Sequence, residues 1–198
     1  MELTEQELRD RGIRRSGEEI EEDARRFAFG VVASLPTGRW VTEPAGEFSH
    51  GEAAVLEGGG LDLSPPAAGE PDPLARTAAR YAAMLATALT TREAAGLLGT
   101  GESRVRQRLK EKTLFGMKAG RENRFPAFQF EGGGEVPGMG EVLRHVDRSL
   151  HPVALSNWFT LPNPDLYLDE EEERAVSPRE WLLSGGAPGV LVPLAGEL

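Results

Sequence analysis

The sequence predicts a mainly α-helical protein with a helix-turn-helix, a small β-hairpin wing and a C-terminal helical domain. Apolar residues recur at spacings of three and four in several stretches, which is the pattern of amphipathic helices. Residues 90–110 read as two short helices, and a glycine-containing turn then separates two apolar segments. We divide the chain into an N-terminal helical segment with an irregular linker (1–71), a helix-turn-helix domain (72–130) and a C-terminal domain (131–198).

The composition limits the classes of function. The chain has 198 residues, a net charge of −10 and no cysteine, so disulfides and thiolate chemistry are excluded. Its first residues are polar and charged, unlike a signal peptide, and no run is long enough to span a membrane. We therefore expect a cytoplasmic protein. The histidines at 50, 145 and 151 lack metal-ligand spacing, so we expect neither a metal nor a cofactor.

The N-terminal segment carries no catalytic motif. An apolar stripe over residues 18–33 predicts a helix that serves packing or oligomerisation, and it is our candidate contact for a homodimer. Residues 34–72 are rich in Gly and Pro, which predicts loops or a linker. Asp72 and Pro73 then begin a helix that we expect to support the helix-turn-helix as a third helix.

Residues 90–110 predict the helix-turn-helix. Thr90 or Thr91 can cap the first helix, with Glu93 completing a capping box, and Gly99 ends it. We expect Ser103 to cap the second helix and Val105 to face inward. Two apolar segments follow and flank a turn at residues 119–123, which predicts the hairpin wing.

The charge of this part of the chain favours DNA binding. Residues 101–125 hold eight Lys and Arg against three acids, about +5, which leaves about −15 for the rest. A basic island in an acidic protein is typical of phosphate binding, and Arg and Gln on a helix can read bases in a major groove. The alternative is a packing helix pair with a solvated charged face. The candidate DNA-binding residues are Thr91, Ser103, Arg104, Arg106, Gln107, Arg108, Lys110, Lys118, Arg121 and Arg124.

The C-terminal domain is expected to be helical. We predict a helix over residues 139–150, a second that begins at Pro152, and a third with Ser177 as cap and Pro178 as its first residue. Five acids at 169–173 read as a solvated loop. Apolar residues run from position 190 to the end of the chain. The large aromatic residues of this domain can serve either the core or an interface with a partner.

Three features of the sequence together resemble antitoxins of the Xre/MbcA/ParS type, the partners of RES-domain toxins. They are the stretch TTREAAGLLGTGESRVRQRL followed by RFPAFQF, the stretch NWFTLPNPDL, and SPREWLLSGGAPGVLVPLA near the C-terminus. The resemblance covers about 110 of the 198 residues, from Thr90 onward. The turn GTGES departs from the commoner Gly-Val-Ser of such proteins.

The resemblance implies two binding functions and no catalysis. The middle domain would bind operator DNA and repress its own operon. The C-terminal domain would cover the active site of a RES-type toxin, an enzyme that degrades NAD, and so neutralise it. No catalytic constellation stands out in the sequence, so we expect no enzyme. The alternative is a helix-turn-helix regulator or DNA-segregation protein without a toxin. The candidate partner-binding residues are Trp158, Leu161, Trp181, Leu182, Gly185, Gly186 and Leu198.

Overall fold

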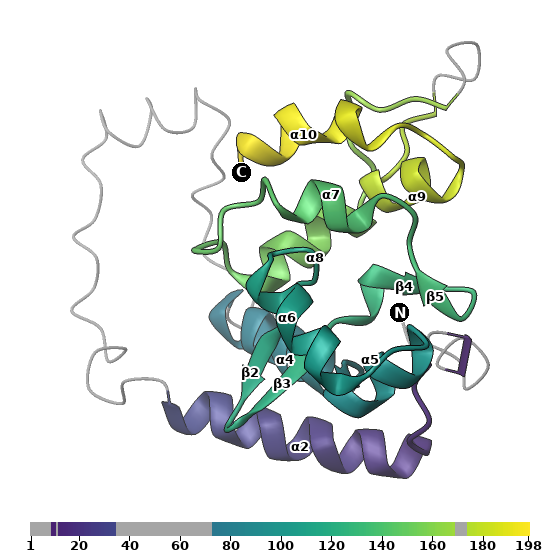
Figure 1. The fold of residues 1–198 in the computed structure, drawn as a ribbon. Coiled ribbons are helices and arrows are strands. Elements are labelled where there is room, and N and C mark those ends of the chain that lie inside the picture. The colour runs from purple at the N-terminus through teal and green to yellow at the C-terminus, as the bar shows by residue number, and fades with distance from the viewer. Residues whose placement is uncertain (1–8, 11, 35–72, 169–173) are drawn as a thin grey trace, which may run out of the picture.

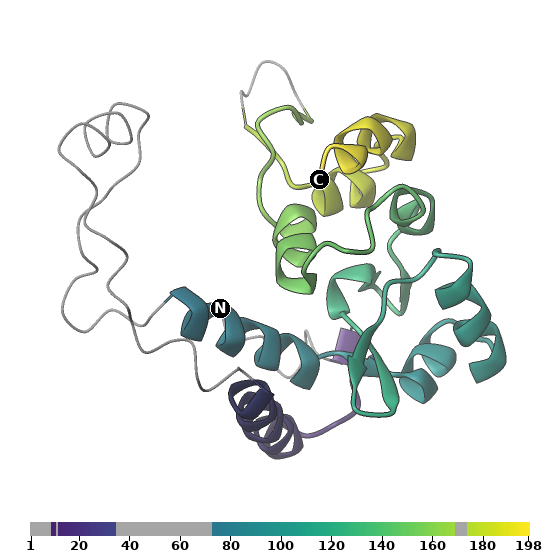
Figure 2. The same cartoon turned by 90° about the vertical axis from the view of Figure 1, so that its left-hand side faces the viewer.

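The computed structural model describes residues 9–10, 12–34, 73–168 and 174–198. The protein is mainly helical with small antiparallel sheets, as predicted (Figures 1 and 2). The expected cap Asp72, the linker at 35–72 and the acidic run at 169–173 lie outside the described residues. Across the described ranges, no helix combines the length and the apolar character needed to cross a membrane.

The N-terminal helix packs against its own chain. Helix α2 (Gly17–Ser34) matches the predicted stretch within a residue and lies along α4 (Pro73–Ala86), which begins at the predicted proline (Figure 1). Ser16 starts α2 through a reciprocal pair of hydrogen bonds with Glu19. Phe27 and Ile20 pack against the two hydrophobic cores of the molecule. Part of the apolar stripe of α2 therefore packs against the same chain, and the homodimer contact stays a prediction.

Helix α5 (Thr91–Leu97) follows the short strand β1 (Leu89–Thr90) and begins with the predicted capping box. The Thr90 hydroxyl accepts from the Glu93 amide at 3.1 Å, and the Glu93 carboxylate accepts from the Thr90 amide at 2.7 Å. Gly99, just beyond the helix, has the left-handed φ of 59° that suits a glycine after a helix end. The cap and the stop are therefore both confirmed.

Helix α6 (Glu102–Lys110) begins two residues earlier than predicted. Its N-cap is Gly101, without a side-chain hydrogen bond, so the prediction that Ser103 caps this helix is wrong. Ser103 lies inside the first turn and is exposed. Val105 is fully buried, as predicted, and packs with Ala94 and Ala95 of α5 in one core. The four residues between the two helices, 98–101, set the angle at which α6 leaves the body of the protein.

The hairpin forms and gains a third strand. Strands β2 (Met117–Ala119) and β3 (Glu122–Phe125) pair antiparallel, and β1 pairs with the other edge of β3. The turn is the two residues Gly120 and Arg121, and Gly120 has a φ of 62°. The predicted turn was wider and included Asn123, which lies in β3 opposite Lys118. Strand β1 joins the hairpin directly to the start of α5.

In the described part of the C-terminal half, the chain forms four short helices and a second hairpin. After the 3-10 turn at Ala127–Gln129, β4 (Phe130–Glu131) pairs with β5 (Gly134–Glu135). Helices α7 (Met139–Leu143), α8 (Pro152–Thr160), α9 (Pro178–Leu183) and α10 (Pro188–Gly196) follow. The predicted helix over 139–150 is too long, because the chain tightens into i→i+3 hydrogen bonds at Arg144 and His145. Pro152 and the Ser177–Pro178 start are placed as predicted.

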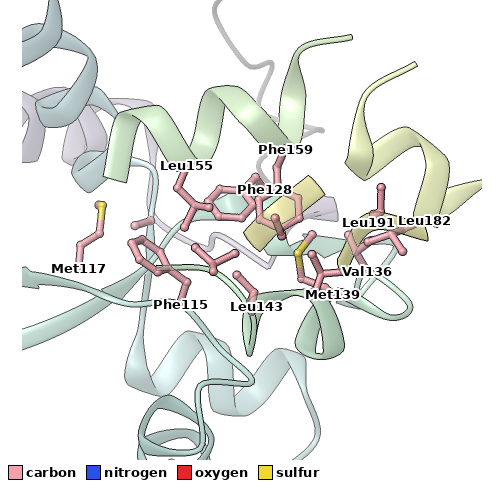
Figure 3. Close-up of a cluster of buried hydrophobic side chains, with 14 of the residues drawn as sticks. Phe115, Met117, Phe128, Val136, Met139, Leu143, Leu155, Phe159, Leu182 and Leu191 are labelled. Carbon is pink, nitrogen blue, oxygen red and sulfur yellow. The ribbon is translucent and has the colours of Figure 1, made fainter. Parts of the chain in front are cut away.

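One hydrophobic core joins the two halves of the chain. Phe115 and Phe128 come from the predicted DNA-binding domain, and Leu155 and Phe159 come from α8 (Figure 3). The rings of Phe128 and Phe159 stack with centroids 5.1 Å apart. The core therefore continues across the predicted boundary between residues 130 and 131.

Arginines reinforce this joint with hydrogen bonds. Arg179 on α9 donates to the carbonyls of Phe128 and Phe130 and pairs with Glu131. Arg148 donates to the carbonyl of Lys112, at the start of the segment between α6 and β2. The C-terminal half is thus fixed to the backbone on both sides of the β2–β3 hairpin.

Candidate nucleic-acid interface

The exposed face of α6 is the centre of the candidate interface. Val105 fixes the rotation of the helix, because its side chain is buried against α5. Residues spaced around the other side are then left in solvent, and most of them are cations or amides. The exposed side chains are Ser103, Arg104, Arg106, Gln107 and Lys110.

Two glutamates occupy the two ends of this face. At the N-terminal end, Glu102 pairs with Arg106 at 2.6 Å and lies 3.9 Å from Arg92 of α5. At the C-terminal end, Glu111 accepts from Gln107 at 2.7 Å and from Arg104 at 3.4 Å. Every charged side chain in these ion pairs is about two-fifths exposed or more, so water screens the attraction between the partners.

Arg108 points away from the exposed face and belongs to the fold. Its guanidinium pairs with Glu135 of β5 at 2.6 Å and donates to the hydroxyl and carbonyl of Thr113. Both partners of the ion pair are about four-fifths buried. Arg108 thus ties α6 to the start of the C-terminal half, and we leave it out of the candidate interface.

The hairpin supplies two further exposed cations, Lys118 and Arg121. Arg124 does not join them, because its side chain is only 7% exposed and lies 3.8 Å from Asp23 of α2. Burial lowers the pKa of Arg124, and Arg15 lowers it further, while Asp23 raises it. Two of its nitrogens, Nε and Nη1, have no hydrogen-bond partner. Arg124 is therefore a buried structural cation and unavailable to phosphate.

A cleft of about 430 Å³ lies where α5, α6 and the hairpin turn meet. Arg92 comes from the first turn of α5, Arg106 from α6 and Arg121 from the turn between β2 and β3. Thr90, the half-buried Thr91, Asn123 and the carboxylates of Glu102 and Glu122 also line it. The cleft thus gathers arginines from three elements that are separate in sequence. Arg92 was missed from the sequence, although its place in the first turn of α5, between the capping-box residues Thr90 and Glu93, is one where a long charged side chain is usually exposed.

The predicted partner-binding residues divide into exposed and internal ones. Leu161 and Leu198 are 56% and 41% exposed. Leu182 is fully buried in the core, and the Trp181 indole covers Gly186 while its Nε1 donates to the Ala187 carbonyl.

The remaining two residues are used differently. Gly185 ends α9 with a left-handed φ of 84° and is exposed, and Trp158 is partly buried against Phe159. Of the seven candidates, Leu182 is buried in the core and cannot contact a partner, whereas Leu161 and Leu198 remain accessible to one. Other large apolar side chains with comparable exposure are Tyr167, Leu168, Leu183 and Val190.

No group of three or more His, Asp or Glu residues within the described ranges could hold a metal ion. No family model, curated protein or solved structure matches this chain.

Proposed function

We propose that this protein is a DNA-binding antitoxin. In this proposal α5, α6 and the β2–β3 hairpin act as a winged helix-turn-helix that binds operator DNA and represses transcription of its own operon. The C-terminal half binds and neutralises a RES-type toxin that degrades NAD. The protein itself performs no chemistry and acts in the cytoplasm as a homodimer.

The observation that carries the DNA-binding proposal is the exposed face of α6 beside the hairpin. Arg104, Arg106 and Gln107 project from one side of a helix whose other side is fixed by Val105. Arg and Gln side chains in this setting can make bidentate contacts to guanine and adenine in a major groove. The cations of the hairpin would position the duplex through its phosphates without reading sequence.

The internal ion pairs of α6 do not prevent this use. Exposed pairs contribute about 0.2–1 kcal/mol each, so a DNA phosphate can replace the carboxylate at small cost. By contrast, Arg108 and Arg124 sit in largely buried pairs, where loss of the partner leaves a costly uncompensated charge. The exposed and buried arginines therefore divide into residues that can bind DNA and residues that hold the fold.

The toxin-binding part of the proposal is supported by the exposed apolar side chains of the C-terminal half. Leu161 follows α8, Leu183 is on α9 and Val190 is on α10. Exposed apolar side chains of this kind can be buried at a protein interface. One observation favours the alternative of a regulator without a toxin. Leu182 is buried in the core and the Trp181 indole is bonded to the Ala187 carbonyl, so these two candidate partner-binding residues already have contacts within the chain.

Two measurements on the full-length protein test the proposal. A fluorescent duplex from the protein's own upstream DNA should bind, and the affinity should fall with salt with a log–log slope of about −3 to −5, as expected for four or five phosphate contacts. Co-expression with the product of the adjacent gene should give a complex that survives purification. Absence of duplex binding at low salt would contradict the DNA-binding half. DNA binding without a complex would favour the regulator alternative.

A further inference from the structure

The cleft between α5, α6 and the hairpin turn is lined by three arginines and by the carboxylates of Glu102 and Glu122, and Glu102 already pairs with two of the arginines. Arg92, Arg106 and Arg121 line it, and the Glu102 carboxylate lies 2.6 Å from Arg106 and 3.9 Å from Arg92. Glu102 is therefore shared between arginines of two different helices. Its two oxygens face the two guanidinium groups separately, Oε2 toward Arg106 and Oε1 toward Arg92.

We propose that this cleft binds a backbone phosphate of duplex DNA, and that Glu102 occupies the phosphate's place in the free protein. The inference rests on the proposed function and adds an assignment of two residues, Arg92 as a phosphate ligand and Glu102 as an internal competitor. A carboxylate and a phosphate offer the same chemistry to arginine, which is a pair of anionic oxygens that accept from the guanidinium fork. Each duplex that binds must first displace the Glu102 carboxylate.

The exposure of the side chains makes this exchange feasible. Arg92 is 91% exposed and Arg106 is 54% exposed, so both can swing toward an incoming phosphate. Glu102 is 39% exposed and can turn into water when it is displaced. Arg121 at the hairpin turn is also exposed and lines the same cleft.

Glu102 also has a structural reason to be present. It is the first residue of α6, where a negative charge stabilises the helix N-terminus. The same carboxylate thus supports the helix that would read DNA and lowers the affinity of that helix for DNA. Such an arrangement weakens non-specific binding, because every phosphate contact in the cleft must compete with Glu102.

The test compares Glu102→Gln with the wild type in a duplex titration. Glutamine keeps the size of the side chain and removes its charge, so Arg92 and Arg106 lose their internal partner. An exposed pair of about 1 kcal/mol corresponds to a change of about fivefold, so the duplex should bind about 3- to 10-fold more tightly. Circular dichroism on each variant checks that the helix content is retained.

The matched control is Glu197→Gln, which changes the net charge equally. Glu197 follows α10, at the end of the molecule opposite the hairpin turn (Figures 1 and 2). The change in duplex affinity caused by Glu197→Gln measures the contribution of net charge alone. Salt screens charges that are far apart, so this change should be small. A second control repeats Glu102→Gln in the Arg92→Gln/Arg106→Gln background, where the gain should shrink to that of Glu197→Gln.

Each outcome decides the inference. Tighter binding that depends on Arg92 and Arg106 supports it. Equal affinity of wild type and Glu102→Gln, or a gain that persists without the two arginines, overturns it while the proposed function stands. If neither the wild type nor Glu102→Gln binds duplex at low salt, the proposed function and this inference fail together.

Discussion

Charge reversal at Arg104 and Arg106 together should weaken duplex binding by about 100-fold or more. Both side chains are about half exposed on α6, and among the described residues they form ion pairs with Glu111 and Glu102, whose carboxylates are about two-fifths exposed. Each arginine that contacts a base or a phosphate contributes about 1–3 kcal/mol, and reversal adds repulsion to the loss of the contact. A fluorescence anisotropy titration with the upstream duplex at fixed salt measures the effect.

The control for this prediction is the double reversal Arg76→Glu/Arg80→Glu on α4. These arginines are also exposed, so the change in net charge is identical, but they lie outside α6 and the cleft. We expect this variant to lose only a minor part of the affinity. An equal loss in both variants would mean that net charge alone governs binding and that α6 has no special role.

Arg108 is deliberately absent from this variant. The sequence places it on the same helix as the other arginines, but its ion pair with Glu135 and its bonds to Thr113 make it part of the fold. A reversal at Arg108 would unsettle the joint between the two halves. Loss of DNA binding by such a variant would therefore say nothing about contacts to DNA.

Phe128→Ala should lower the free energy of unfolding by about 3–5 kcal/mol, the usual cost of a large cavity at a buried phenylalanine. The ring is 5% exposed, stacks on Phe159 and lies 6.5 Å from Phe115 (Figure 3). This is a large share of the 5–15 kcal/mol that keeps an ordinary domain folded. Chemical denaturation followed by circular dichroism measures the change.

The same substitution tests whether the two halves unfold together. Because Phe128 shares its core with Met117 of β2 and with α8 and α9, hydrogen exchange should quicken in the β2–β3 hairpin as well as in α8 and α9. Leu183→Ala, a truncation at a 41% exposed position of α9, should change stability by only about 0.5 kcal/mol. Faster exchange in α8 and α9 with unchanged exchange in the β2–β3 hairpin would contradict a shared core.

Local signals in the sequence predicted the helix starts well. The Thr90–Glu93 box, Pro73, Pro152 and the Ser177–Pro178 pair all lie where their hydrogen bonds or fixed φ are needed. Such signals act over three or four residues, so the sequence contains all the information that they require. The tight turn at Gly120 is of the same kind.

The roles of individual cations could not be predicted, because they depend on partners far away in the chain. Arg108 is held by Glu135, and Arg124 is buried beside Asp23 of a helix at the other end of the sequence. Both counted as members of the basic island from their charge alone. Leu182 likewise matches an interface pattern but fills the core beside α10, which only the tertiary packing decides.

The most direct test of the central claim follows the backbone amide NMR signals of the full-length protein during titration with a short upstream duplex. Binding through α6, the cleft and the hairpin predicts the largest shifts at residues 91–92, 102–111 and 118–122. The signals of α8, α9 and α10 should change little. Shifts confined to those three helices, or no shifts at low salt, would contradict the claim that α6 and the hairpin form a DNA-binding surface.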